Sequence, residues 1–248
     1  MKSFLLALQF LTIIPARIKK IMPGEMARAA AYFPAVGLLL GLALWLVSHL
    51  LSLAQIDPIP SNMILVALLI ILTGGLHLDG LSDTSDAIFS GKGKTDMLII
   101  MRDPHVGVIG VLAIVSILML KVAFLSSILP NIKGIALVLM CVLARWSMSF
   151  SVFAFSYARD DGKAKPFMDG TNKSIFFVST LIALAIAFII SRAAGPAIFG
   201  ITAAFTYLVN SLIKKKLGGI TGDTIGAVNE LVETAVLSGV VILQRIIL

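Results

Sequence analysis

The stretch Gly74-Gly75-Leu76-His77-Leu78-Asp79-Gly80-Leu81-Ser82-Asp83-Thr84-Ser85-Asp86 places three carboxylates at the end of a long apolar run. On a helix, Asp79, Asp83 and Asp86 stand at positions i, i+4 and i+7, so they share one narrow face. Like charges at this spacing repel one another and call for a compensating cation. Carboxylate oxygens are preferred ligands of Mg²⁺, which commonly joins protein carboxylates to substrate phosphates. The stretch therefore predicts a site for Mg²⁺, Mn²⁺ or Ca²⁺ rather than zinc or copper, and the first hypothesis is chemistry on a phosphate or diphosphate at a membrane surface.

The composition of the chain is typical of an integral membrane protein. Its 248 residues have a mean hydropathy of +1.03, and they are 58% apolar and only 13% charged. Soluble domains have about 25% charged residues. At roughly 20 apolar residues per span, this length suits about seven transmembrane helices. The apolar runs lack the alternation of an outer-membrane β-barrel. We therefore expect an all-α, polytopic membrane helix bundle that forms a single domain over residues 1–248.

Hydrophobic runs separated by Pro, Gly and Asp delimit the expected spans. The spans cover residues 32–54, 62–78, 106–129, 132–157, 174–191, 197–213 and 225–248. The apolar segment 1–14 is short for a span and is not followed by a small-residue cleavage site. It is interpreted as an interfacial or re-entrant helix rather than a signal peptide. The lone Cys141 excludes an intrachain disulfide and any cysteine-based metal site.

Basic residues gather on alternate connections between the spans, which orients the bundle. One side has only Lys133, Arg192 and Arg245, whereas the other has Arg17, Lys19, Lys20, Arg28, Lys92, Lys94, Arg102, Arg159, Lys163, Lys165, Lys173, Lys214, Lys215 and Lys216. An excess of Lys and Arg in short loops marks the cytoplasmic side. We expect a multi-pass protein of the cytoplasmic (inner) membrane. The net charge of +7 follows from this topology and requires no nucleic-acid partner.

A second acidic group opens the last expected span. The motif Gly218-Gly219-Ile220-Thr221-Gly222-Asp223-Thr224-Ile225-Gly226 precedes Asn229, Glu230 and Glu233. Asp223 and Glu230 are seven residues apart and share a helix face, although Asp223 is also suited to be the helix N-cap. Acids inside a lipid-embedded helix need partners or water. Because both acidic groups fall on the cytoplasmic side, we expect one metal-diphosphate site to include both.

Other polar residues are candidates for binding the substrate. His77 is suited to a structural hydrogen bond or to the role of a proton acceptor. Arg102 and Asp103 precede glycines that permit close approach to a phosphate, although Arg102 also suits a positive-inside anchor. Arg145 lies deep enough in a span to need Glu230, Glu233 or a substrate phosphate as its partner.

Two further features of the spans concern helix packing. Lys121 also lies deep enough in a span to need a partner, and the alternative is that its side chain snorkels towards the interface. Gly37 and Gly41 are four residues apart in the first span, which indicates a close helix crossing or a homodimer contact.

Three motifs resemble the cobalamin synthase family, the adenosylcobinamide-GDP ribazoletransferases. The first is the stretch 74–86, the second is Ile100-Met101-Arg102-Asp103-Pro104-His105-Val106-Gly107-Val108-Ile109-Gly110, and the third is the segment 217–227. The resemblance covers nearly the whole chain, including Phe10-Leu11-Thr12 and Tyr32-Phe33-Pro34-Ala35-Val36-Gly37. The loop 158–173 departs from the family pattern.

The resemblance implies a Mg²⁺-dependent membrane enzyme of the last assembly step of cobalamin. Its small-molecule substrates would be GDP-activated adenosylcobinamide and α-ribazole or its 5′-phosphate, and GMP would be released. In line attack by a ribose hydroxyl needs a carboxylate, Asp83 or Asp86, to accept the proton. Carried onto this chain, the metal ligands are Asp79, Asp83, Asp86, Asp223 and Glu230, and the substrate-binding candidates are His77, Arg102, Asp103, Arg145 and Thr221.

Two other classes of membrane protein use intramembrane acids. A CDP-alcohol phosphatidyltransferase also transfers a substituted phosphate, but its Asp-Gly-x-x-Ala-Arg spacing is missing from this sequence. A cation-coupled transporter would place its acids near the bilayer midplane, whereas these acids cluster towards one surface. Metal-dependent GMP formation by the purified protein would distinguish the enzyme from the transporter.

Overall fold

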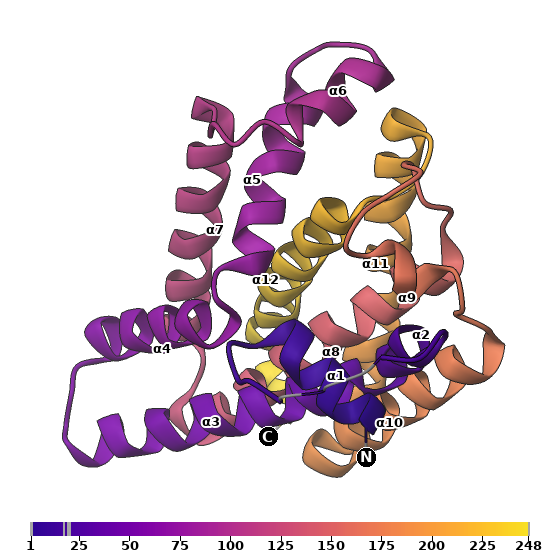
Figure 1. The fold of residues 1–248 in the computed structure, drawn as a ribbon. Helices are drawn as coiled ribbons and strands as arrows, with labels where there is room; N and C mark the ends of the chain where they lie inside the picture. Colours follow the sequence, from indigo (N-terminus) through magenta and orange to yellow (C-terminus); the bar gives the residue numbers. More distant parts are fainter. Residues whose placement is uncertain (1, 17, 19–20, 248) are drawn as a thin grey trace.

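The computed structural model describes residues 2–16, 18 and 21–247, which form a helical protein without a β-strand in these residues (Figure 1). Two short 3₁₀ helices, η1 (Ala30–Tyr32) and η2 (Pro130–Ile132), precede α3 and α8. The α-helices are α1 (Lys2–Leu11), α2 (Glu25–Ala29), α3 (Phe33–Leu53), α4 (Pro58–Thr73), α5 (Leu76–Phe89), α6 (Lys94–Ile100), α7 (Val108–Ser127), α8 (Lys133–Ala154), α9 (Lys165–Met168), α10 (Lys173–Ser191), α11 (Ala194–Leu217) and α12 (Gly222–Ile247).

Six of the described helical segments are long and apolar enough to cross a membrane, and a seventh span is obtained if α4 and α5 count together. The predicted multi-pass α-helical architecture is therefore confirmed. Apolar side chains of α7 and α10 face outwards, as in lipid-exposed helices, and include Met119 and Ile189.

The expected span 62–78 is wrong at its end, because the helix breaks at Gly74 and Gly75. These residues have φ of 62° and 70°, a left-handed conformation that glycine adopts without steric cost. The chain therefore leaves α4 after Thr73 and starts α5 at an angle of 91°. With 14 residues, α5 is too short to cross a membrane by itself. The three aspartates thus lie on a separate helix that is turned back against the bundle.

The other expected spans agree with the helices to within a few residues. The expected spans leave residues 192–196 as a connection, but α11 already begins at Ala194 and includes Pro196 in its first turn. Proline is tolerated in the first turn of a helix, where its missing N–H has no partner to lose. The expected helix near the N-terminus is α1. Met1, Arg17, Lys19, Lys20 and Leu248 lie outside the described residues.

The bundle is organised around α8, which is buried along nearly its whole length. A Cβ atom on Gly37 would lie 2.4 Å from the backbone oxygen of Cys141, and one on Gly41 would lie 2.6 Å from Cα of Val138. These distances are possible only for glycine, so α3 and α8 approach backbone to backbone. The expected close helix crossing is confirmed within one chain.

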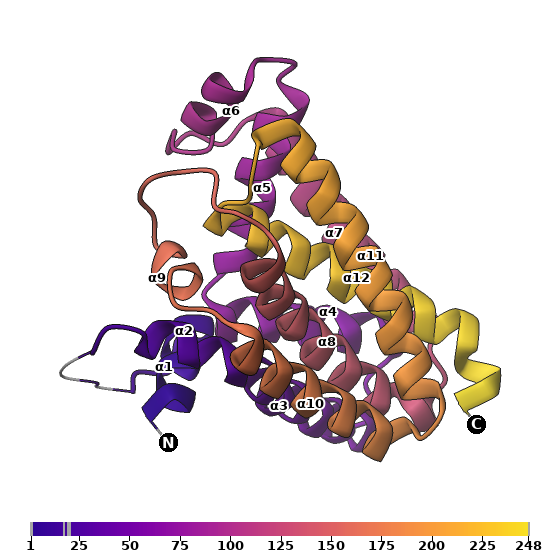
Figure 2. The same ribbon diagram turned by 90° about the vertical axis from the view of Figure 1, so that its right-hand side faces the viewer.

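The last helix, α12, passes through the middle of the molecule. Figure 1 shows α5 and α7 on one side of it and α11 on the other, and Figures 1 and 2 both show α6 at one end of the bundle. This arrangement brings α5 and the start of α12, which are far apart in the sequence, into direct contact.

Candidate active site

The site begins with a close crossing between α5 and α12. A Cβ atom on Gly80 would lie 2.5 Å from the backbone oxygen of Asp223, and one on Gly226 would lie 3.2 Å from Cα of His77. A side chain at Gly80 would therefore force the helices apart. Because both residues are glycine, the aspartates of α5 and Asp223 of α12 lie on adjacent backbones.

Asp79, Asp83 and Asp223 form an acidic group at this crossing. Asp79 and Asp223 line the same pocket. Asp83 is half-buried, and its pKa is raised to about 7 by burial and by the charges of Asp79, Asp223 and Asp86. The predicted meeting of the two acidic segments is therefore confirmed for these three residues. A carboxylate with such a pKa can accept a proton near neutral pH.

The start of α12 explains why the Asp223 carboxylate remains available. Thr221 Oγ1 accepts a hydrogen bond from the Thr224 backbone N–H at 3.2 Å, and Thr224 Oγ1 accepts from the Thr221 N–H at 2.8 Å. This reciprocal pair caps the helix in the manner of a capping box. Thr221 is thus a capping residue, and Asp223 is not needed as the N-cap.

A short backbone bridge places a cation beside Asp223. Ala158 N–H donates to the Ile220 carbonyl at 2.8 Å, and Ile220 N–H donates to the Ser156 carbonyl at 2.9 Å. The bridge fixes the loop after α8 against the segment before α12. Arg159 then donates through Nη1 to Asp223 Oδ2 at 3.0 Å. The acidic group is consequently only partly neutralised.

Asp86 is placed differently from the other two aspartates of α5. Its Oδ2 accepts from the Gly107 N–H and its Oδ1 from the Gly110 N–H, each at 2.8 Å. Both donors belong to the first turn of α7 or the residue before it, where helix N–H groups lack intrahelical partners. Asp86 therefore joins α5 to α7, and its oxygens are less available for a metal ion than was expected.

Glu230 does not lie with the aspartates but belongs to a buried ion network. Lys121 Nζ lies 2.6 Å from Glu230 Oε2 and also contacts Glu233. Arg145 is fully buried and pairs with Glu233. Of the partners expected for Arg145, the structure shows Glu233. The expectation that Lys121 needs a partner is confirmed, and its snorkelling alternative is wrong. Two acids and two bases balance one another here, as buried charges require. Glu230 therefore pairs with Lys121 and does not join the aspartates that were expected to bind the metal with it.

His77 connects this ion network to the pocket. The Asn229 amide nitrogen donates to Glu233 Oε1 and lies 3.1 Å from Nδ1 of His77. The carboxylate of Glu233 fixes the direction of the amide, so Nδ1 must accept and Nε2 carries the proton. This Nε2–H has no hydrogen-bond partner among the described residues.

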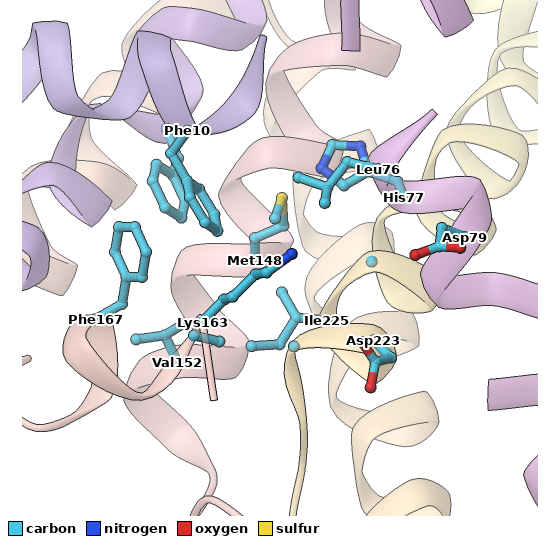
Figure 3. Close-up of a pocket in the computed structure, with 14 residues that line it drawn as sticks. Phe10, Leu76, His77, Asp79, Met148, Val152, Lys163, Phe167, Asp223 and Ile225 are labelled. Carbon is cyan, nitrogen blue, oxygen red and sulfur yellow. The ribbon is translucent and has the colours of Figure 1, made fainter. Parts of the chain in front are cut away.

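A cavity of about 100 Å³ lies next to the acidic group (Figure 3). In this view, Phe10 and Phe167 lie at one end, Asp79 and Asp223 at the other, and His77 and the Lys163 ammonium between them. The aromatic end is tightly arranged, with 4.4 Å between the ring centroids of Phe10 and Phe167. The pocket thus has an apolar end and a charged end.

Arg102 and Asp103 lie on the exposed connection between α6 and α7. Arg102 pairs with Asp161, and Asp103 Oδ1 accepts from the His105 backbone at 2.9 Å. This backbone hydrogen bond, followed by the one from the His105 side chain, lowers the pKa of Asp103. Neither residue lines the pocket described above.

The acidic group has the chemistry of a Mg²⁺ site without being a complete coordination sphere. Among the described residues, no three His, Cys, Asp or Glu side chains converge as ligands of one ion. In phosphoryl-transfer sites, Mg²⁺ typically uses one or two carboxylates, and waters and substrate phosphates provide the other ligands. Asp79 and Asp223 are oxygen donors that line the same pocket, so this pair fits that mode.

Sequence reasoning missed several residues of the site. Lys163 and Arg159 were attributed to topology, because a basic loop residue carries no other local signal. Asn229 was noted only as a neighbour of the glutamates. Phe167 comes from the loop 158–173, which departs from the family pattern. Their shared location depends on the backbone bridge and on the packing of α9, which the sequence does not display.

The fold and the site define a polytopic α-helical membrane protein with carboxylates at one end of a largely apolar pocket, an arrangement suited to group transfer on a phosphate. The chain belongs to the cobalamin-5-phosphate synthase family, whose family model matches residues 3–241. The resemblance seen in the motifs is therefore confirmed.

Relatives match over almost their full length. A protein named adenosylcobinamide-GDP ribazoletransferase from Desulforamulus reducens is 36% identical over 244 residues, which are 98% of each chain. Proteins of the same name from Thermoanaerobacter pseudethanolicus and Acinetobacter baumannii are 38% and 36% identical, with 95% and 96% of each chain covered. No solved structure matches this chain.

Proposed function

We propose that this protein is an adenosylcobinamide-GDP ribazoletransferase, which joins the phosphocobinamide group of its GDP-activated substrate to α-ribazole or α-ribazole 5′-phosphate. A ribose hydroxyl attacks the phosphorus that carries the cobinamide arm, the bond to the GMP oxygen breaks, and GMP leaves. Family membership and the names of the relatives support this reaction over a phospholipid headgroup transfer or ion transport.

One observation supports the place in the fold that we propose for the reaction, namely the contact of Gly80 with the Asp223 backbone. This contact brings Asp79 and Asp223 together at the pocket, with Asp83 close to both. Asp83 accepts the proton of the attacking hydroxyl, because its raised pKa suits a general base near neutral pH. Lys163 points its ammonium into the same pocket and provides a cation for a phosphate oxygen.

Mg²⁺ is the cofactor that we propose for this site, and Asp79 and Asp223, which line the same pocket, are the residues that would hold it. When bound, it neutralises charge on the diphosphate during transfer. Asp86 positions α5 against α7 through Gly107 and Gly110. Glu230 balances Lys121 within the bundle.

We also propose that the site faces the cytoplasm from the inner membrane. Basic residues of separate connections come together near it. Lys214, Lys215 and Lys216 lie in the last turn of α11, and the Lys94 side chain lies against Gly218, the residue that ends this helix. Short loops rich in Lys and Arg remain on the cytoplasmic side. Both substrates are water-soluble and are expected to enter from that side.

GMP release tests the proposal. The purified full-length protein in detergent is incubated with the GDP-activated corrinoid and α-ribazole, with and without Mg²⁺. We expect GMP and the joined product only when both substrates and the metal are present. GMP formation at the same rate in excess chelator would remove the metal from the proposal, and the absence of product under all conditions would remove the activity.

A further inference from the structure

The pocket beside the acidic group contains an unused hydrogen-bond donor in apolar surroundings. His77 is only 1% exposed, and the network through Asn229 and Glu233 holds the proton on Nε2. A buried donor without an acceptor costs about 1–3 kcal/mol. The fold therefore maintains a costly N–H group at the wall of a cavity, which indicates that a ligand provides the acceptor.

The rest of the pocket specifies the shape of this ligand. Phe10, Phe33 and Phe167 line its far end, and the ring centroids of Phe33 and Phe167 are 5.5 Å apart. Met148 and Val152 of α8 complete the apolar wall. Aromatic walls favour a flat aromatic ring, which they contact by stacking or edge-to-face packing. The cavity of about 100 Å³ is several times the ~10–15 Å³ that one water molecule requires.

We propose that this pocket binds the benzimidazole base of α-ribazole, and that the Nε2–H of His77 donates a hydrogen bond to the ring nitrogen that does not carry the ribose. This assignment rests on the proposed function. The base of a benzimidazole riboside has a single free ring acceptor and is otherwise apolar, so it matches one donor among aromatic side chains. The ribose extends to the charged end of the pocket, where its hydroxyls reach Asp79 and Asp223.

The same chemistry argues against guanine as the occupant. Guanine has a carbonyl, an amino group and several ring nitrogens that need partners, and each polar group left unpaired against the phenylalanines would weaken binding. A lipid chain has no acceptor for Nε2–H. His77 is accordingly a specificity residue for the base, whereas the aspartates act on the phosphate.

Equilibrium dialysis of two ligands against the full-length protein in detergent tests the assignment. One ligand is α-ribazole, and the other is its analogue with 5,6-dimethylindole as the base, in which a C–H replaces the free ring nitrogen. Without corrinoid substrate or added Mg²⁺, the wild-type protein should bind α-ribazole at least about tenfold more tightly than the indole riboside. Equal affinities in the wild-type protein would overturn the assignment.

Three variants locate the effect. His77→Phe keeps an aromatic ring but lacks the donor, so the preference for α-ribazole should disappear. The control His49→Phe makes the same change at an exposed residue of α3 and should retain the wild-type preference. Val152→Phe fills the pocket without touching the ion network and should weaken both ligands about equally. This third variant keeps the test decisive if His77→Phe does not fold.

Competition with GDP completes the experiment. If GDP displaces α-ribazole and Val152→Phe weakens GDP binding, the pocket belongs to the nucleotide and the assignment is wrong. GMP formation by the wild-type protein is measured separately. If product forms while both ribosides bind equally, the reaction stands and the base site lies elsewhere. If α-ribazole is preferred but no GMP forms, the base site stands and the proposed reaction fails.

Discussion

Gly80→Ala is the change that most directly tests how the site is assembled. The new Cβ atom would lie 2.5 Å from the Asp223 backbone oxygen, and ordinary contacts begin at 3.4 Å, so α5 and α12 must separate locally by about 0.9 Å. Overpacking of this kind costs about 1–3 kcal/mol. Alanine regains about 1 kcal/mol in helix propensity, so the net loss of stability is at most about 2 kcal/mol.

Catalysis should be affected much more than stability. A displacement of about 1 Å of groups that position a substrate can reduce the rate by about 10²-fold. We therefore expect Gly80→Ala to lower kcat/KM for GMP formation about 100-fold, while Tm in detergent falls by no more than about 8 °C.

Gly239→Ala is the matched control in the same helix as Asp223. A Cβ atom at Gly239 would meet nothing within 4 Å, so this variant should keep wild-type activity and at least wild-type Tm. The reasoning is refuted if Gly80→Ala is fully active, or if Gly239→Ala loses as much activity.

Four further predictions concern the acids. Asp83→Asn should lower GMP formation by about 10²–10⁴-fold at unchanged Tm, whereas the exposed control Asp96→Asn should be fully active; an active Asp83→Asn removes this residue from the site. Because the pKa of Asp83 is about 7 and the base form is the deprotonated one, kcat/KM should fall as the pH drops below about 7; a flat profile from pH 6 to 8 contradicts its role as the base. Asp86→Asn loses one of two backbone hydrogen bonds to α7, so unfolding measurements should show a loss of about 1–3 kcal/mol with most activity retained; a folded but inactive variant would instead favour metal binding. Glu233→Gln leaves Lys121 and Arg145 under-neutralised in the bundle and should cost about 3–5 kcal/mol, and an unchanged Tm would show that the network does not hold the helices together.

The sequence by itself determined the membrane class, nearly all of the spans and the family. These properties depend on composition, on apolar run length and on motifs that are contiguous in the chain. The shared helix face of Asp79, Asp83 and Asp86 also follows from spacing alone. The break at Gly74-Gly75 was visible only as two flexible residues, because the sequence does not show which conformation glycine adopts.

The tertiary structure decided how the acids divide their roles. Asp86 and Asp83 look alike in the sequence, but two backbone N–H groups at the start of α7 reach only Asp86. Glu230 and Asp223 share an expected helix face, yet Lys121 from α7 lies beside one and Arg159 beside the other. The partner of a carboxylate is the group within about 3 Å of it, and here that group comes from a segment distant in the chain. Local spacing shows where the charges are, and packing determines what each charge does.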